Sequence, residues 1–133
     1  MSTANSSAQF DFADQLALIS SEILRFRIKN KATLSSDEKS RLEDVEVKLD
    51  KATAKVRANG IASLGAVTAP KRLEVETATK DAEALLRRIK NIARALDIAT
   101  SVLNLAIAAM AGQPQGILTA LNTVKNAVAG DTA

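Results

Sequence analysis

Apolar residues recur along most of the chain at alternating steps of three and four, the spacing that places side chains along one side of an α-helix. The pattern predicts four helices, over about residues 10–30, 36–58, 70–111 and 115–128. Because the connections between them are short, successive helices should lie antiparallel. The expected fold class is therefore all-α: an elongated antiparallel bundle of four helices with coiled-coil-like heptad packing.

Residues that begin or end helices support these boundaries. Ser35 and Glu38 have the spacing of a capping box, which starts a helix after the first break in the pattern. Gly60 follows the second predicted helix and is suited to the left-handed conformation that stops a helix. Pro70 falls in the first turn of the third helix, where its missing N–H is harmless, and Pro114 follows its end.

The third predicted helix determines the shape that we expect for the molecule. Its apolar stripe runs from Val75 to Met110 without a slip in the 3–4 spacing. A helix over residues 70–111 would be roughly 63 Å long at the usual rise. A compact globule of this chain length has a diameter of about 36 Å. The sequence therefore predicts an elongated molecule.

The chain is long enough for one domain. Its 133 residues suffice for a single core but not comfortably for two. Residues 10–129 are expected to form this helical domain. Residues 1–9 are small and polar and should form a disordered tail, and residues 130–133 a frayed end.

Charge is distributed unevenly along the chain, with no charged residue between Asp97 and Lys125. Residues 98–128 therefore form an apolar hairpin, with Lys125 as its single charge, behind a charged front. In one arrangement the first helix runs beside residues 96–111 and covers this hairpin. In the other, the first helix folds back on the second and leaves the hairpin exposed. The broad apolar stripe of the first helix favours the covered arrangement.

The apolar hairpin gives the strongest candidate site for an interaction. An exposed apolar surface of this size marks contact with a partner or a membrane, whereas a covered one belongs to the core. The residues expected to carry the contact are Leu103, Ile107, Met110, Ile117, Leu121 and Val124.

Basic residues from two segments are expected to meet where the third helix becomes apolar. If the second helix folds back along the third, the end of the first helix lies at the same level as residues 87–94. Eight basic side chains would then form a collar suited to an anionic surface, and a solvated basic face is the simpler interpretation. They are Arg25, Arg27, Lys29, Lys31, Arg87, Arg88, Lys90 and Arg94.

The composition excludes several kinds of chemistry. The chain has no Cys and no His, which removes thiol nucleophiles, Cys-bound metals and the commonest general base. Most carboxylates lie beside Lys or Arg on charged faces, and Asp97 stands three residues from Arg94, a spacing that favours a local ion pair. We therefore expect no enzyme, and no catalytic residue, metal site, cofactor or small-molecule substrate.

Nucleic acid is disfavoured as a partner. The net charge is only +3, the three aromatic residues are all Phe, and no recognition motif is present. Residues 98–111 span about 21 Å as a helix, short of the roughly 30 Å hydrocarbon layer, so a constitutive transmembrane helix is not expected. With no signal peptide visible, cytoplasm is the default location. The Ser-rich leader leaves export without a signal peptide open.

The first functional interpretation is a non-enzymatic helical protein that acts through protein–protein contacts or self-association. An alternative is a membrane-active subunit that exposes the hairpin of residues 98–128 beside the basic collar. That layout resembles helical pore-forming toxin subunits and secretion translocators, although no motif identifies such a family. A second alternative is a small inhibitory or immunity-type binding protein, which the sequence does not distinguish from the first interpretation.

Overall fold

The computed structural model describes residues 10–60, 64, 65 and 67–129. The tail expected over residues 1–9 and the frayed end over residues 130–133 lie outside this part of the chain. Within it, the regular structure is helical throughout, so the all-α fold class is confirmed. The helices are α2 (Phe12–Lys29), α3 (Ser36–Ala58), α4 (Ala69–Arg88), α5 (Ile92–Ala111) and α6 (Pro114–Ala129).

Most of the predicted helix ends are confirmed. The Ser35 Oγ accepts a hydrogen bond from the Glu38 backbone N–H at 3.1 Å, and the Glu38 carboxylate accepts one from the Ser35 N–H at 2.8 Å, which completes the capping box. Pro70 lies in the first turn of α4. Gly112 ends α5 in the left-handed conformation with φ 72°. These contacts satisfy backbone groups that a helix terminus leaves unpaired.

The single helix predicted over residues 70–111 does not form, and the count of four helices is wrong. The chain leaves the helical conformation at Ile89, whose φ of −72° and ψ of 147° are extended. Asn91 then caps a new helix, because its side-chain oxygen accepts from the Arg94 N–H at 3.0 Å. The described chain has five helices, and the longest, the 23-residue α3, reaches only about 35 Å. The expected 63 Å rod is therefore absent.

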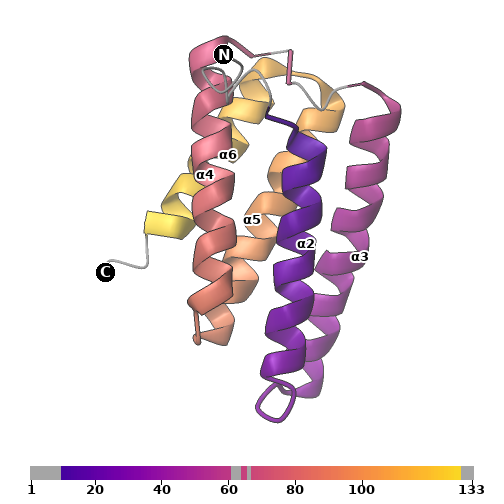
Figure 1. Ribbon diagram of the computed structural model, residues 1–133, viewed down its shortest axis with the longest axis vertical. Helices are drawn as coiled ribbons and strands as arrows, with labels where there is room; N and C mark the ends of the chain where they lie inside the picture. Colours follow the sequence, from indigo (N-terminus) through magenta and orange to yellow (C-terminus); the bar gives the residue numbers. More distant parts are fainter. Residues whose placement is uncertain (1–9, 61–63, 66, 130–133) are drawn as a thin grey trace, which may run out of the picture.

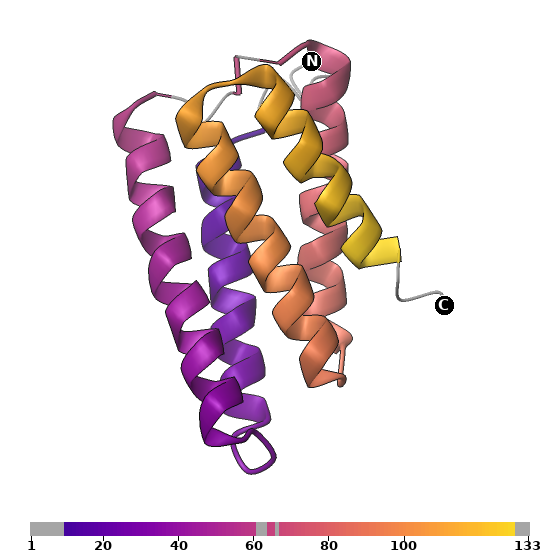
Figure 2. The same ribbon diagram turned by 180° about the vertical axis from the view of Figure 1, so that it is seen from behind.

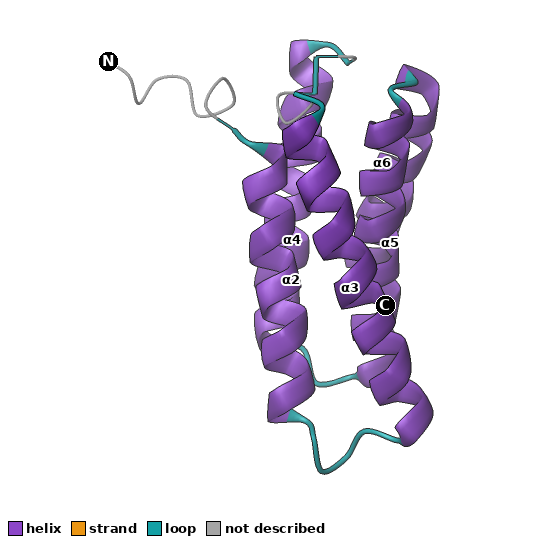
Figure 3. Cartoon of the chain, turned by 90° about the vertical axis from the view of Figure 1, so that its right-hand side faces the viewer, coloured by secondary structure: helices purple, strands orange, loops and turns teal. Residues whose placement is uncertain are grey.

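Each helix runs antiparallel to the next, from α2 through α6 (Figure 1). In space, α2 packs between α3 and α4, while α5 packs against α3 and α6, and α6 also packs against α4. Figures 2 and 3 show α5 and α6 lying together across the other helices. As a result α3 and α5, which are not consecutive, lie side by side and run in the same direction.

Neither expected arrangement of the first helix is correct. α2 folds back on α3, as in the exposed arrangement, but the α5–α6 hairpin does not project from the bundle. The break at residues 89–91 lets the hairpin fold over α3 and α4 instead. This reversal buries half of the residues of α5, and burial of apolar surface is the main force that favours it.

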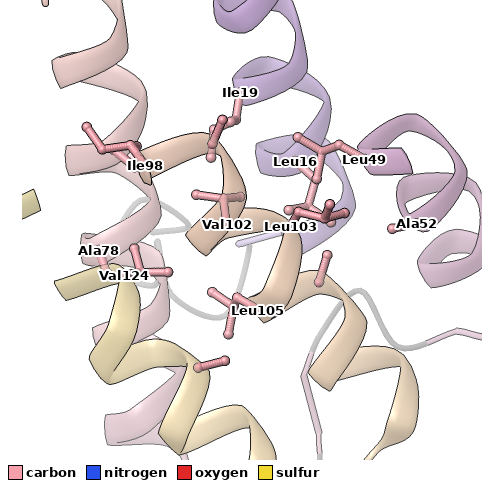
Figure 4. Packing of buried hydrophobic residues seen from close by; sticks show 14 of the residues in the cluster. Leu16, Ile19, Leu49, Ala52, Ala78, Ile98, Val102, Leu103, Leu105 and Val124 are labelled. Carbon is pink, nitrogen blue, oxygen red and sulfur yellow. The ribbon is translucent and has the colours of Figure 1, made fainter. Parts of the chain in front are cut away.

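All five helices contribute to one core. Figure 4 shows side chains from α2, α3, α4 and α6 converging on α5. The fully or almost fully buried residues at this junction include Leu16, Ile19, Leu49, Ala78, Ile98, Val102, Leu105 and Val124. Since α5 lies among the other four helices, its surface-exposed residues are confined to a narrow strip.

Candidate functional site

The six residues predicted on the apolar hairpin divide between the core and the surface. Ile117, Leu121 and Val124 of α6 are at most 1% exposed, and they pack in the core. On α5, Leu103 is also buried, whereas Ile107 is 49% exposed and Met110 is partly buried. Only the end of α5 near Met110 therefore presents predicted contact residues to a partner.

Ile107 and Met110 border a groove between the parallel helices α3 and α5. The part nearest Met110 has a volume of about 440 Å³. It continues toward the start of both helices as a space of about 570 Å³, which shares Lys48, Leu103 and Ile107. The part nearest Met110 is lined by Lys48, Lys51, Ala52, Ala54, Lys55, Leu103, Ile107 and Met110.

The two walls of this groove differ in charge because α3 carries its charges on two flanks. One flank is acidic and faces α2: the Asp50 carboxylate accepts from the Ser20 hydroxyl at 2.6 Å, and Glu46 accepts from Arg27 at 2.9 Å. The opposite flank carries Lys48, Lys51 and Lys55 beside α5. The α5 wall has no charge, because the sequence has none between Asp97 and Lys125.

Two of the three lysines have no ionic partner in the described chain. Lys48 approaches Asp44 at 3.0 Å, whereas Lys51 and Lys55 take part in none of the ion pairs formed there. None of the contact residues expected from the sequence lies on this lysine flank of α3. The steps of three and four between Lys48, Lys51 and Lys55 are the signal that could have found it.

The basic residues predicted as a collar gather at one end of the molecule, where three of them, Arg25, Arg27 and Arg87, approach carboxylates. The ends of α2 and α4 and the start of α5 meet at this end (Figure 1). Arg27 pairs with two glutamates of α3 at 3.1 and 2.9 Å. Arg87 pairs with two glutamates, Glu22 at 3.2 Å and Glu83 at 2.7 Å. Arg94 donates to the Ala127 carbonyl at 3.0 Å. The remaining members are Lys29, Lys31, Arg88 and Lys90.

A second groove, of about 790 Å³, lies between α4 and α6. Leu73, 49% exposed, contributes to its lining, and charged residues of both signs surround it. Lys125 donates to the Glu74 carboxylate at 3.0 Å across this groove. Hydrogen bonds from Lys125 and then Lys71 lower the pKa of Glu74 below its ordinary value. The mixed charges give this groove no single complementary partner.

α5 has the length and composition of a helix able to cross a membrane, with a mean hydropathy of 1.5. This observation is weak, since a core helix of a bundle has the same properties. In this structure 56% of the most apolar 18-residue stretch of α5 is buried among the other helices. The apolar character of α5 is thus accounted for by its place in the core.

Comparison of the chain with models of protein families, with curated proteins and with solved structures finds no match. No relative therefore supplies residue roles for this chain. The part of the α3–α5 groove nearest Met110 combines the half-exposed Ile107 with three lysines and no acidic lining residue, which makes it the strongest candidate site. Arg41 and Asp44, the latter paired with Lys48 at 3.0 Å, line its continuation toward Ser40.

Proposed function

We propose that the protein is a non-enzymatic interaction protein that binds an acidic amphipathic helix of a partner in the groove between α3 and α5. The observation that carries this proposal is the pairing of an apolar floor with a wall of lysines. Docking of the apolar face of a helix in a hydrophobic groove is a common mode of peptide recognition. The partner's acidic residues would face the lysine wall.

The dimensions of the groove support a helical occupant. Its α3 wall extends from Ser40 to Lys55, which corresponds to about 22 Å, or four helical turns. Ile107, half exposed at the middle of the groove, supplies the apolar anchor, and Leu103 and Met110 flank it one turn away. An apolar ridge on a partner helix would remove Ile107 and the exposed part of Met110 from water.

The charge on the groove supports an acidic occupant. Lys48, Lys51 and Lys55 follow one another along α3 at steps of three and four, so their side chains form a row parallel to the groove. Acidic residues at the same steps on a docked helix would face this row. Such complementarity mainly increases the association rate and the specificity of binding.

The test uses two synthetic amphipathic helices of about four turns with the same leucine ridge. One carries glutamates along one flank of the ridge, and the other carries lysines there. Fluorescence anisotropy should show micromolar binding of the acidic peptide, which weakens as salt is added, and much weaker binding of the basic peptide. Ile107→Asp and the double change Lys51→Glu with Lys55→Glu should each weaken acidic-peptide binding by about tenfold or more.

Matched controls separate the groove from general effects. Leu73→Asp introduces the same charge at an equally exposed apolar residue on α4, and Lys29→Glu with Lys31→Glu changes the net charge as much as the double lysine change in the groove. Both controls should leave binding unchanged. Equal binding of the two peptides, or full binding by a folded Ile107→Asp variant, would contradict the proposal. Binding to anionic vesicles but to neither peptide would favour a membrane-active subunit instead.

A further inference from the structure

Among the described helices, α2 carries the most exposed large apolar side chains. Six large apolar side chains are exposed in this part of the protein, and three of them belong to α2: Leu18 at 50%, Leu24 at 38% and Ile28 at 63%. In Figure 1, α2 lies in front of the bundle between α4 and α3. None of the other described helices covers its outward face.

Four residues form a stripe along this face. Asp14, Leu18, Ser21 and Arg25 follow one another at steps of four, three and four, so they share one side of the helix. All four are exposed, whereas the core stripe of α2 lies on its opposite side. From its start to its end, the outward stripe therefore consists of an acidic, an apolar, a small and a basic residue.

We propose that a second copy of this chain packs on this stripe, with the two α2 helices antiparallel. In a two-fold pairing centred between Ile19 and Ser20, Asp14 faces Arg25 of the second copy and Leu18 faces Ser21 of the second copy. Both contacts then occur twice, as a symmetric interface requires. When the helices are antiparallel, each residue of the stripe faces a complementary one on the second copy: acid faces base, and leucine faces serine. A parallel pairing in register would place each charge opposite its own kind.

The charged ends of the stripe are available for this contact. The Asp14 side chain is 67% exposed, and its Oδ1 accepts from Arg57 at 2.9 Å. A carboxylate has two oxygens and about four acceptor positions, so Asp14 can accept from a second arginine as well. Arg25, whose side chain is also 67% exposed, approaches Glu22 only at 3.7 Å. An exposed acid at one end and an exposed base at the other supply the charge complementarity.

The middle of the stripe supplies shape complementarity. Leu18 is a large side chain that projects from α2, and Ser21 is a small one, so the leucine of each copy fits over the serine of the other as a knob fits a hole. In this register the two Leu18 residues lie about 4.5 Å apart along the helix axis, less than one turn. Each therefore also contacts the other, and their burial excludes water from the neighbouring ion pairs.

The bonds that hold α2 in the bundle leave the stripe open. Ser20 and Arg27 bond to α3 on one flank, and Gln15 and Glu22 bond to α4 on the other. These bonds fix the orientation of α2, so the stripe is held toward solvent in the free protein. Little reorganisation would accompany pairing, which favours association.

The size of the stripe sets the expected affinity. It is only about 17 Å long from Asp14 to Arg25, and Ile28 extends the apolar surface beyond its basic end. An interface of this size is at the small end of specific contacts, so we expect a weak dimer with a Kd of about 10 to 100 µM. Because exposed ion pairs contribute, the dimer should weaken as salt is added.

Sedimentation equilibrium over about 1 to 500 µM, a range that brackets such a weak interface, tests the proposal. The unaltered chain should change from monomer to dimer over this range. Asp14→Arg places two arginines opposite each other twice in the dimer, and Arg25→Asp does the same with aspartates. Each single variant should dimerise at least about tenfold more weakly. The double variant, and an equimolar mixture of the two single variants, should recover dimerisation.

Uncharged variants keep the result clear if a charge change disturbs the fold, which circular dichroism checks. Leu18→Ser removes the apolar knob and should also give a monomer. Leu73→Ser is the matched control on α4, because Leu73 is equally exposed, and it should dimerise normally.

A bulky variant tests the space that receives Leu18. Ser21→Arg fills this space and should prevent pairing. Thr77→Arg is its control, at an exposed position of α4, and should leave pairing unchanged.

Two results would overturn the proposal: a constant monomer mass for the unaltered chain, or normal dimerisation of a folded Asp14→Arg variant. The second result would arise if the helices paired in another register, which would not bring Asp14 to Arg25. Acidic-peptide binding by Leu18→Ser should equal that of the unaltered chain, because α2 does not line the groove between α3 and α5. A failure of this dimer is therefore distinct from a failure of the groove.

Discussion

Arg87 links two helices through carboxylates that differ in exposure. Its guanidinium donates to Glu22 of α2 at 3.2 Å and to Glu83 of its own helix at 2.7 Å. The Glu22 side chain is only 6% exposed, and one of its oxygens accepts no hydrogen bond within the described chain. Glu83 also accepts from Gln15 at 2.8 Å. Arg87 therefore compensates a buried negative charge at the interface of α2 and α4.

We predict that Arg87→Met lowers the free energy of unfolding by about 2 kcal/mol, because a charged hydrogen bond to a buried carboxylate is lost. Arg88→Met is the control, since Arg88 is exposed and forms no ion pair in the described chain; it should change stability by less than about 0.5 kcal/mol. Urea unfolding followed by circular dichroism measures both. Equal effects of the two substitutions would show that Glu22 does not depend on Arg87.

At the scale of single residues, the sequence predicted the apolar face of each helix but not what covers it. Leu103 and Ile107 lie one turn apart on α5, and both were predicted to contact a partner. Leu103 is 7% exposed and Ile107 is 49% exposed. Leu103 belongs to the core cluster, whereas Ile107 is open to the groove. Burial of this kind depends on which helices pack nearby, and the local sequence pattern does not predict it.

Helix boundaries were predicted where the chain contains a strong local signal. The capping box at Ser35 and the left-handed conformation of Gly60, whose φ is 68°, are both confirmed. The break at residues 89–91 was missed because it contains neither Gly nor Pro, and the apolar spacing continues through Ile89 and Ile92. Tertiary burial of α5 determines this break, with Asn91 as its only local indication.

The cap at Asn91 can be measured directly. We predict that Asn91→Ala lowers the free energy of unfolding by about 1 kcal/mol, the usual cost of removing an N-cap side chain. The matched control is Asn104→Ala, an exposed position inside the same helix, which should be neutral or slightly stabilising because Ala favours helix. Urea unfolding of both variants tests this. A neutral Asn91→Ala variant would mean that packing alone holds the start of α5.

At the scale of the whole molecule, α6 is much less enclosed than α2 or α5. It packs mainly against α4 and α5, and four of its 16 residues are buried, against half of the residues of α2 and of α5. Its side-chain bond to α4 runs from Lys125 to Glu74, both of which are partly exposed to water. Because the pKa of Glu74 is lowered in the folded protein, this bond persists above the ordinary pKa of a glutamate and weakens as pH falls through the lowered value.

We predict that α6 opens before the rest of the bundle. Local opening needs the least free energy where few apolar contacts are broken, so amide hydrogens of α6 should exchange at least about tenfold faster than those of α2 or α5. Hydrogen exchange resolved by mass spectrometry or NMR measures the difference. Uniform protection across all five described helices would instead indicate a single cooperative unit.

The neighbouring positions of α3 and α5 have a consequence for how the protein is made. The two walls of the groove are separated in the sequence by all of α4 and the turn that follows it. Contacts between distant segments form late, because closing the intervening loop costs entropy. During synthesis, the groove cannot exist until α5 has been made and has folded back onto α3. A nascent or truncated chain that ends within α4 would be unable to bind through it.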